Sequence, residues 1–249
     1  MAALAPEIIA TFGPFSVTNT LLNTLLVDAA LIGLALSVKK HLSTIPGKLQ
    51  NFVEMVFEPF YNLVESIADK RVVYIFPYFM TFFLFILFAN WSVFIPGINT
   101  IGFKEVKDGH TEIIPFFRVA TSDINTTFAL ALVSAIATHI LSIRLTGFRD
   151  YVGRFIALNH ILLFVGLLEL VSEVTKVVSL SFRLFGNIFA GETVLHTVAG
   201  LVPNFLAVLV PLPFMALEVI VGFVQALVFA MLTFVFMAIL STPHHQKEH

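Results

Sequence analysis

Long apolar stretches are the feature that most constrains how this chain can fold. A bilayer core about 30 Å thick is crossed by about 20 apolar residues in an α-helix, which satisfies every backbone N–H and C=O group without water. Several stretches reach that length, and no soluble domain separates them. We therefore expect an all-α polytopic membrane protein with spans at 18–38, 74–95, 122–143, 156–200 and 214–240.

The composition supports this class. Of the 249 residues, 58% are hydrophobic and only 12% are charged, against about 25% charged in soluble domains. The absence of cysteine excludes disulfides, iron–sulfur clusters and thiolate metal sites. The net charge of −2 and the lack of a basic tract give no support for a nucleic-acid partner. We expect one membrane domain over 1–249, and no basic residue precedes the first apolar run as a secretory signal peptide requires.

Residues 48–70 differ from the spans. Their apolar residues recur at helical spacing, namely at Phe52, Val56, Phe60, Leu63 and Ile67. Acidic residues lie off this stripe, which predicts an amphipathic helix at the membrane interface. This helix separates an N-terminal segment and first span (1–47) from the second and third spans (74–155). We expect residues 1–17 to lie at the surface and residues 96–121 to form a polar loop.

The last part of the chain, 156–249, contains two long apolar stretches. A continuous helix over 156–200 would extend far beyond a bilayer at about 1.5 Å per residue, so it must bend back or lie strongly tilted. Pro203, Pro211 and Pro213 predict a break before the last span. Together with the earlier spans, this gives about five membrane passes, the last two as long tilted C-terminal helices.

Lysine and arginine predict the orientation. Basic residues follow the first and third spans, whereas the 200–213 connection has none. Because basic residues accumulate in cytoplasmic loops, we expect the N-terminus outside and the C-terminus in the cytoplasm.

Arg183 lies inside the long apolar stretch 156–200. A guanidinium cannot lose its charge by deprotonation, and placing it at membrane depth costs at least about 2.5 kcal/mol. Apolar sequence continues for more than a turn on both sides, which disfavours snorkelling to the headgroups. The structural alternative is a buried ion pair with Glu173. We interpret Arg183 as a functional residue.

Helical periodicity gives Arg183 polar neighbours. At about 100° per residue, one stripe carries Glu169, Ser172, Lys176, Ser179 and Asn187 near the direction of Arg183. A polar stripe on a lipid-embedded helix needs a partner surface. Glu192 points to the opposite side if the helix continues through Gly191, and His196 could pair with Glu192 four residues earlier.

The carboxylates form two groups along the expected membrane depth. Glu169 and Glu173 lie toward the cytoplasm from Arg183, and Glu192 and Glu218 lie toward the outside. Gln225 shares a face with Glu218 but lies deeper, because it is seven residues further along an inward-running helix. The arrangement indicates two partial proton routes separated by a fixed positive charge.

Polar residues also stand at the ends of spans. Asn90 lies near the exit of the second span, and Asp123 and Asn125 open the third. Asp123 or Thr121 is either a helix cap or part of a proton pathway, and the sequence leaves both roles open. We include Asn90, Asp123 and Asn125 among the candidate residues.

The stretch Ser-Leu-Ser-Phe-Arg-Leu-Phe-Gly-Asn-Ile-Phe-Ala-Gly-Glu at 179–192 resembles the signature of subunit a of the bacterial-type F-type ATP synthase. Supporting matches are Phe-Ala-Asn-Trp at 88–91, Ser-Asp-Ile-Asn-Thr-Thr at 122–127, Leu-Glu-Leu-Val-Ser at 168–172 and Gln225. The similarity covers most of the chain from about residue 48 onward.

This resemblance implies a proton-translocating stator subunit that forms two half-channels beside a rotating ring of c subunits and couples proton flow to ATP synthesis. The implied partners are the c ring, the peripheral-stalk b subunits, the rest of the ATP synthase and the lipid bilayer. The implied location is the bacterial plasma (inner) membrane. ATP chemistry would occur on other subunits, so we expect a non-catalytic chain without cofactor or metal.

The resemblance also implies roles for single residues. Arg183 would face the ion-binding carboxylate of the ring, and Asn187, Glu192, Glu218 and Gln225 match positions on the proton path. Some members have a histidine where Glu218 stands. A mechanism that requires a histidine there would need a substitute in this chain, such as His196.

Two other classes remain as alternatives. A haem-bearing redox subunit would use His139, His160 or His196, but these do not form an obvious facing pair at matched depth. A proton-coupled secondary transporter usually has an internal repeat and paired broken helices, and the sequence has neither.

Overall fold

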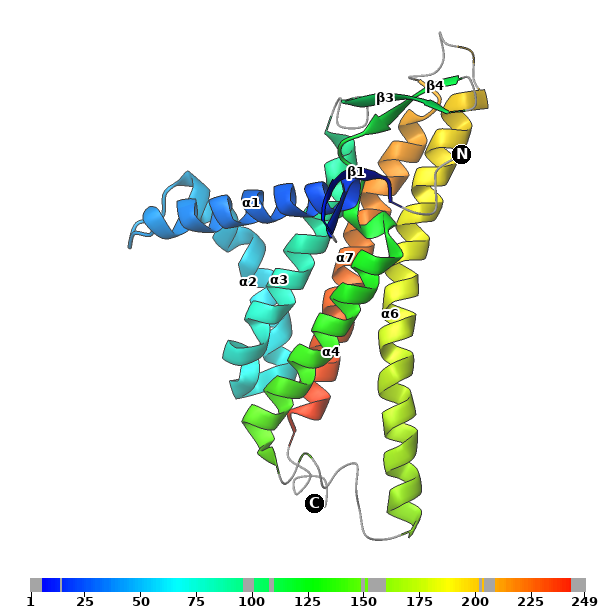
Figure 1. Ribbon diagram of the computed structural model, residues 1–249. Helices are drawn as coiled ribbons and strands as arrows, with labels where there is room; N and C mark the ends of the chain where they lie inside the picture. The colour runs from blue at the N-terminus through cyan, green and yellow to red at the C-terminus, as the bar shows by residue number, and fades with distance from the viewer. Residues whose placement is uncertain are drawn as a thin grey trace. The chain divides into compact units, whose positions relative to one another are not determined.

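The computed structural model describes residues 6–13, 15–95, 101–107, 110–148, 151, 160–201, 203 and 209–242. Helices dominate these residues, as predicted (Figure 1). The α-helices are α1 (Asn19–Lys40), α2 (Lys48–Ala68), α3 (Val72–Trp91), α4 (Ile124–Thr146), α6 (His160–Leu201) and α7 (Leu212–Leu240). Short 3-10 helices are η1 (Asp69–Arg71), η2 (Ser92–Phe94) and η3 (Ala120–Ser122).

Within the described residues, four helical segments are long and apolar enough to cross a membrane: Asn19–Lys40, Lys48–Phe94, Ile124–Thr146 and Leu212–Leu240. They cover the first, second, third and last predicted spans. The chain is therefore an all-α polytopic membrane protein. The predicted amphipathic helix is present as α2, and its location at the membrane interface stays a prediction.

Helix α6 contains 42 residues, which corresponds to a length of about 60 Å at 1.5 Å per residue. It continues without interruption through Gly191. The alternative in which this stretch bends back is therefore wrong for the described residues 160–201. A tilt relative to the bilayer stays a prediction. Helix α7 begins at Leu212, directly after Pro211, and contains the third predicted break residue, Pro213, in its first turn.

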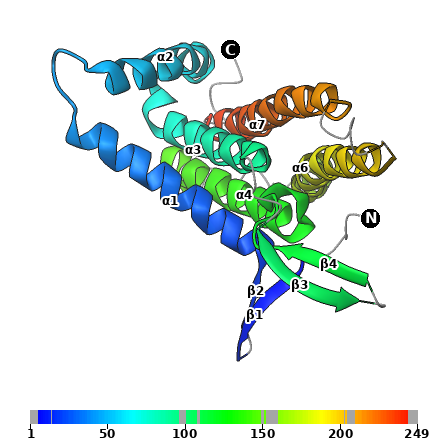
Figure 2. The ribbon, with the colours of Figure 1, turned by 90° about the horizontal axis from the view of Figure 1, so that it is seen from above.

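Two short β-hairpins were not predicted. Strand β1 (Ile8–Phe12) pairs antiparallel with β2 (Phe15–Thr18), and β3 (Gly102–Lys107) pairs antiparallel with β4 (His110–Pro115). They occupy the segments that we expected to be a surface segment and a polar loop. Both hairpins lie beside the N-terminal end of α1 (Figure 1, Figure 2). Gly13, with a φ of 62°, supplies the left-handed backbone of the first turn.

The chain divides into two compact units, which we describe separately. The first contains Met1–His41, Phe83–Thr127 and Arg183–Leu227, and the second contains Leu42–Phe82, Phe128–Phe182 and Val228–His249. In the first unit, buried Val27, Ala89 and Ala120 form a small core. Leu31 and Phe85 pack against this core and connect α1 to α3.

Aromatic rings pack the second unit. The ring of Phe79 lies 5.6 Å from that of Phe60 and 6.2 Å from that of Phe234, measured between centroids. Arg71 secures the C-terminal end of α7, because its Nη1 donates to Ala238 O at 3.1 Å and to Thr242 Oγ1 at 2.9 Å. The first of these bonds reaches a carbonyl in the last turn of α7, where partners from helical N–H groups run out.

Candidate functional site

In the first unit, buried polar side chains of α1 form hydrogen bonds with η2 and with the residue that precedes α4. Thr20 Oγ1 donates to Asp123 Oδ2 at 3.2 Å, and Asn23 Nδ2 donates to Ser92 Oγ at 2.9 Å. Each of these four side chains is at most 5% exposed. A buried polar group without a partner is costly, so these hydrogen bonds allow a membrane helix to carry Thr20 and Asn23.

Asn90 connects α3 to η3 and α7 in the same unit. Its Oδ1 accepts from Thr121 Oγ1 at 2.6 Å, and its Nδ2 donates to Gly222 O at 3.0 Å. The next residue, Trp91, donates its Nε1–H to Val219 O at 3.2 Å. These contacts require a close approach of the α7 backbone, which Gly222 permits because a Cβ there would lie 3.1 Å from Asn90 Cβ. A role of Asn90 in a proton path stays a prediction.

Asp123 is the N-cap of α4. Its Oδ1 accepts from the backbone N–H of Asn125 at 2.9 Å, and the Asn125 side chain donates to the same oxygen at 3.2 Å. This is the usual bond of an N-cap carboxylate to the first turn of a helix. Of the two candidates for a cap, Asp123 is therefore the residue that caps, whereas Thr121 donates to Asn90. Pathway roles for Asp123 and Asn125 stay predictions.

Glu192 of α6 and Glu218 of α7 lie together with Arg118, which precedes η3. Arg118 Nη2 is 3.6 Å from Glu192 Oε2, and the two side chains are 8% and 13% exposed. Glu218 is 6% exposed, and its Oε1 lies 3.2 Å from the position that a Cβ on Gly191 would take. Within the described residues, Oε2 of Glu192 and Oε2 of Glu218 are buried and have no hydrogen-bond partner. The two carboxylates predicted toward the outside thus share one environment with a guanidinium.

Asn187 and Gln225 join α6 to α7 in the first unit. Asn187 Nδ2 donates to Gln225 Oε1, and Gln225 is 4% exposed. Arg183, one turn before Asn187, is exposed, and no described residue forms a hydrogen bond or an ion pair with it. Asn187 thus contacts α7, whereas Arg183, in the same 179–192 stretch, is exposed.

The predicted polar stripe of α6 is largely uncovered in this chain. Ser172, Ser179, Arg183 and Asn187 are exposed, and Glu169 and Lys176 are half-buried. The apolar residues Leu180, Leu184 and Ile188 are buried instead. The partner surface expected for this stripe stays a prediction.

Glu173, the alternative partner considered for Arg183, forms an ion pair with Lys176 and lies close to His139 in the second unit. Its Oε1 lies 2.7 Å from Lys176 Nζ, and its Oε2 lies 3.8 Å from His139 Nε2. Lys176 Nζ also lies 4.5 Å from the ring centroid of Phe236. Lys176 is therefore neutralised inside the chain, in contrast to Arg183.

A small cavity adjoins this ion pair. It has a volume of about 20 Å³ and is lined by Glu173 and Lys176 of α6 and by Ser134 and Thr138 of α4. A site of this size accommodates about one water molecule when polar partners line it. These side chains could therefore pass a proton through a water molecule.

Of the three histidines considered for a haem site, the structure describes only the side chain of His139. His139 exchanges a hydrogen bond of 2.8 Å with the Tyr151 hydroxyl. The side chains of His160 and His196 lie outside the described residues, so the predicted pairing of His196 with Glu192 stays a prediction. Across the part of the chain that the structure describes, no group of His, Cys, Asp and Glu side chains could hold a metal ion.

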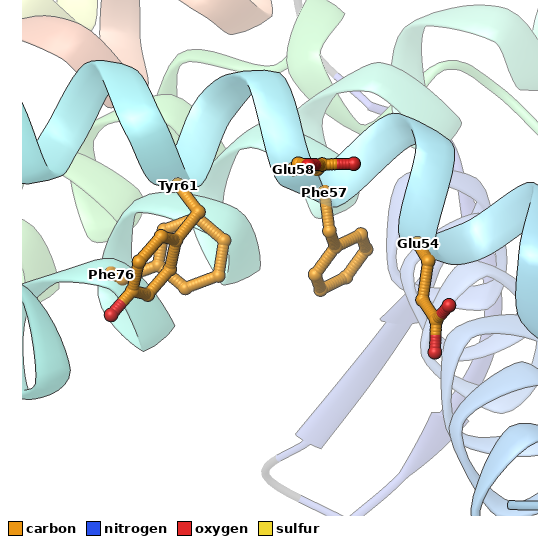
Figure 3. Close-up of a pocket in the computed structure, with 5 residues that line it drawn as sticks. All are labelled: Glu54, Phe57, Glu58, Tyr61 and Phe76. Atoms are coloured by element: carbon orange, nitrogen blue, oxygen red, sulfur yellow. The ribbon is translucent and has the colours of Figure 1, made fainter. Parts of the chain in front are cut away.

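A larger cavity lies away from these polar residues. It has a volume of about 410 Å³ and is lined by Glu54, Phe57, Glu58, Tyr61 and Phe76. Figure 3 shows the rings of Phe57, Tyr61 and Phe76 beside α2, with Glu54 further along the helix. The rings pack edge to face, with centroids of Tyr61 and Phe76 5.1 Å apart. None of the predicted site residues lines this cavity.

Sequence reasoning missed Arg118. It belongs to a segment outside the predicted spans, so its burial was not expected. The signal in the sequence was weak: Arg118 stands four residues before the third predicted span, which begins at 122. Thr20 was missed as well, since a single threonine at the start of a span carries little information.

The fold and these residues define a class: a polytopic helical membrane protein that holds charged and hydrogen-bonded polar side chains among its apolar helices. The family described as ATP synthase A chain matches residues 20–238. The chain is 35% identical over 239 residues to ATP synthase subunit a of Moorella thermoacetica, covering 96% of this chain and 97% of that protein. It is 32% identical over 239 residues to ATP synthase subunit a of Syntrophobacter fumaroxidans, covering 94% and 89%.

This chain belongs to the ATP synthase subunit a family, the proton-translocating subunit of the membrane sector. The resemblance inferred from residues 179–192 is thereby confirmed.

Proposed function

We propose that this chain forms two proton half-channels beside a ring of c subunits and couples proton flow to rotation of the ring. The observation that carries the proposal is the contrast between two cations of α6. Lys176 is paired with Glu173, whereas Arg183 is exposed and has no hydrogen bond or ion pair with a described residue. An unpaired guanidinium at membrane depth is costly, so its counter-charge must come from a partner.

A carboxylate on the ring supplies that counter-charge. It crosses lipid only when protonated, because the ionised form is too costly there. Near Arg183 the opposite charge favours the ionised form, at an energy of about 4 kcal/mol for charges 4 Å apart at an effective dielectric constant of 20. The ring carboxylate therefore releases its proton to one route and takes a proton from the other, and Arg183 prevents a direct proton leak between the routes.

The two routes use different groups of residues. The outer route contains Glu192 and Glu218, followed by the hydrogen-bonded pair Asn187 and Gln225. The inner route contains Glu169, Ser172, Glu173, Lys176 and the small cavity beside them. Each route exchanges protons with the ring carboxylate that lies next to Arg183.

The proposal includes the location of the chain and its partners. The chain lies in a bacterial plasma (inner) membrane with its N-terminus outside and its C-terminus in the cytoplasm, since basic residues follow the first and third spans. Its partners are the c ring, the b subunits of the peripheral stalk and the rest of the ATP synthase. The chain carries out no covalent chemistry.

The experiment is ATP synthesis and passive proton leak in vesicles that contain the assembled complex with Arg183 replaced. Arg183→Lys keeps a charge but loses the planar fork and changes its reach, and it should nearly abolish synthesis. Arg183→Ala should abolish synthesis and permit leak, while Asn187→Ala should be milder. Arg144→Ala is the matched control, because Arg144 is an exposed arginine in the last turn of α4. Full coupled synthesis by Arg183→Ala would refute the proposal.

A further inference from the structure

The outer carboxylate site contains more negative than positive charge. Glu218 is buried and the Glu192 side chain is 13% exposed, and Arg118, whose Nη2 lies 3.6 Å from Glu192 Oε2, is the described cation at this site. Two ionised carboxylates beside one guanidinium would leave one negative charge without compensation. A buried uncompensated charge is costly, and a carboxyl group avoids this cost by holding a proton.

Other groups around the site do not change this balance. Asp123 is hydrogen-bonded by Thr20 and caps α4. Ser122 accepts a bond from Arg118 Nε at 3.1 Å, and its own hydroxyl donates to Val119 O at 2.9 Å. Neither brings a second positive charge to the two glutamates.

The two glutamates have different surroundings. Glu192 faces Arg118 at 3.6 Å, so its ionised form is compensated. Glu218 lies against the Gly191 backbone, and its buried Oε2 has no hydrogen-bond partner within the described residues. Glu218 is therefore the group for which the neutral form is the less costly one.

Resting on the proposed function, we propose that Arg118 is the positioning residue of the outer route: it compensates Glu192 and leaves Glu218 as the carboxyl group that carries the transferable proton. Glu218 takes a proton from water at the outer side and passes it on as the ring turns, returning to the neutral form with the next proton. Arg118 acts only through the glutamates and touches no substrate. In this chain Arg118 thus supplies the positive charge beside Glu192 and Glu218.

Infrared spectra of the full chain in lipid vesicles at neutral pH test this inference, with each variant compared with the wild type. A protonated carboxyl group has a carbonyl band that a carboxylate lacks. The wild-type chain should show the band of one buried protonated carboxyl group, and Glu218→Gln should remove it. Arg118→Gln should add a second such band, since both glutamates then lack a cation. Glu192→Gln should also remove the band, because Glu218 then becomes the partner of Arg118.

The double variant with Arg118→Gln and Glu192→Gln should restore a single band, since Glu218 is again without a cation. Arg118→Lys keeps the charge and should keep the wild-type spectrum, which separates loss of charge from loss of fold. Glu65→Gln, at an exposed position of α2, is the matched control and should leave the band unchanged. The inference is overturned if Arg118→Gln has the wild-type spectrum or if Glu218→Gln keeps the band.

These spectra need neither the ring nor transport, so they can fail while the proposed function stands. In the assembled complex, Arg118→Gln should slow proton-driven ATP synthesis at least about tenfold, the factor that corresponds to about 1.4 kcal/mol of lost charge compensation. Arg118→Lys should restore most of that rate.

Discussion

Replacing Gly222 with alanine tests the close contact between α3 and α7 in the first unit. A Cβ at this position would lie 3.1 Å from Asn90 Cβ and 3.6 Å from Trp91 Cδ1. The first distance is shorter than the optimum of about 3.5–4.0 Å between carbon atoms, so α3 and α7 must move apart. The same movement lengthens the 3.0 Å hydrogen bond from Asn90 Nδ2 to Gly222 O.

The magnitude follows from these two effects. Inserting a methylene-sized group into a packed interior costs about 1–3 kcal/mol, and loss of a typical hydrogen bond costs about 0.5–1.5 kcal/mol. Gly222→Ala should therefore lower the free energy of unfolding by between about 1.5 and 4.5 kcal/mol. Better helix propensity of alanine, worth up to about 1 kcal/mol, offsets only part of this loss.

Thermal unfolding of the purified chain in detergent, followed by circular dichroism, measures the effect. Gly33→Ala is the matched control, because Gly33 lies inside α1 and no atom outside its own helical turn lies within 4 Å of its Cβ position. The control should unfold at the wild-type temperature or above it, and Gly222→Ala should unfold several degrees lower. Equal unfolding temperatures for the two variants would show that α3 and α7 are not in the close contact described.

Two further predictions concern other parts of the path. The natural chain lacks cysteine, so single cysteines in place of Glu192 or Glu218 should react with a water-soluble thiol reagent from the outside, and those in place of Glu169 or Glu173 from the cytoplasm; equal labelling from both sides would contradict the two routes. Asp123→Ala should destabilise the chain by about 1 kcal/mol through loss of the α4 cap, while Asp123→Asn should cost only a fraction of that, and equal losses in thermal unfolding would argue against the cap.

The helices could be predicted because one physical effect determines them. Burial of about 20 apolar residues in lipid outweighs local preferences, and each predicted span contains a helix in the described residues. The hairpins could not be predicted, since their stability comes from backbone pairing. The Lys104–Lys107 stretch, for example, lacks the alternation of apolar and polar residues that indicates a strand.

The site was predictable only along single helices. The periodicity of α6 placed Arg183 and Asn187 on one exposed stripe, as observed. Periodicity does not indicate which helices meet, so the hydrogen bond of Asn187 to Gln225 was not predicted. Periodicity offered Glu192 a partner on the same helix, His196, and that pairing stays a prediction. It could not indicate the described partner, Arg118, which lies far away in sequence.

The position of Arg118 gives the segment between α3 and α4 a structural role. Fixing a long side chain costs up to about 2 kcal/mol of conformational entropy, so a guanidinium that acts by charge alone is best held by a rigid backbone. The Phe116 N–H donates to Ile101 O at 2.9 Å, and the rings of Phe116 and Phe103 pack with centroids 4.7 Å apart. The Arg118 N–H in turn reaches Asn19 O at 3.5 Å. We infer that the β3–β4 hairpin and the start of α1 hold this backbone in place, so that a residue outside the predicted spans can determine the charge state of two glutamates within them.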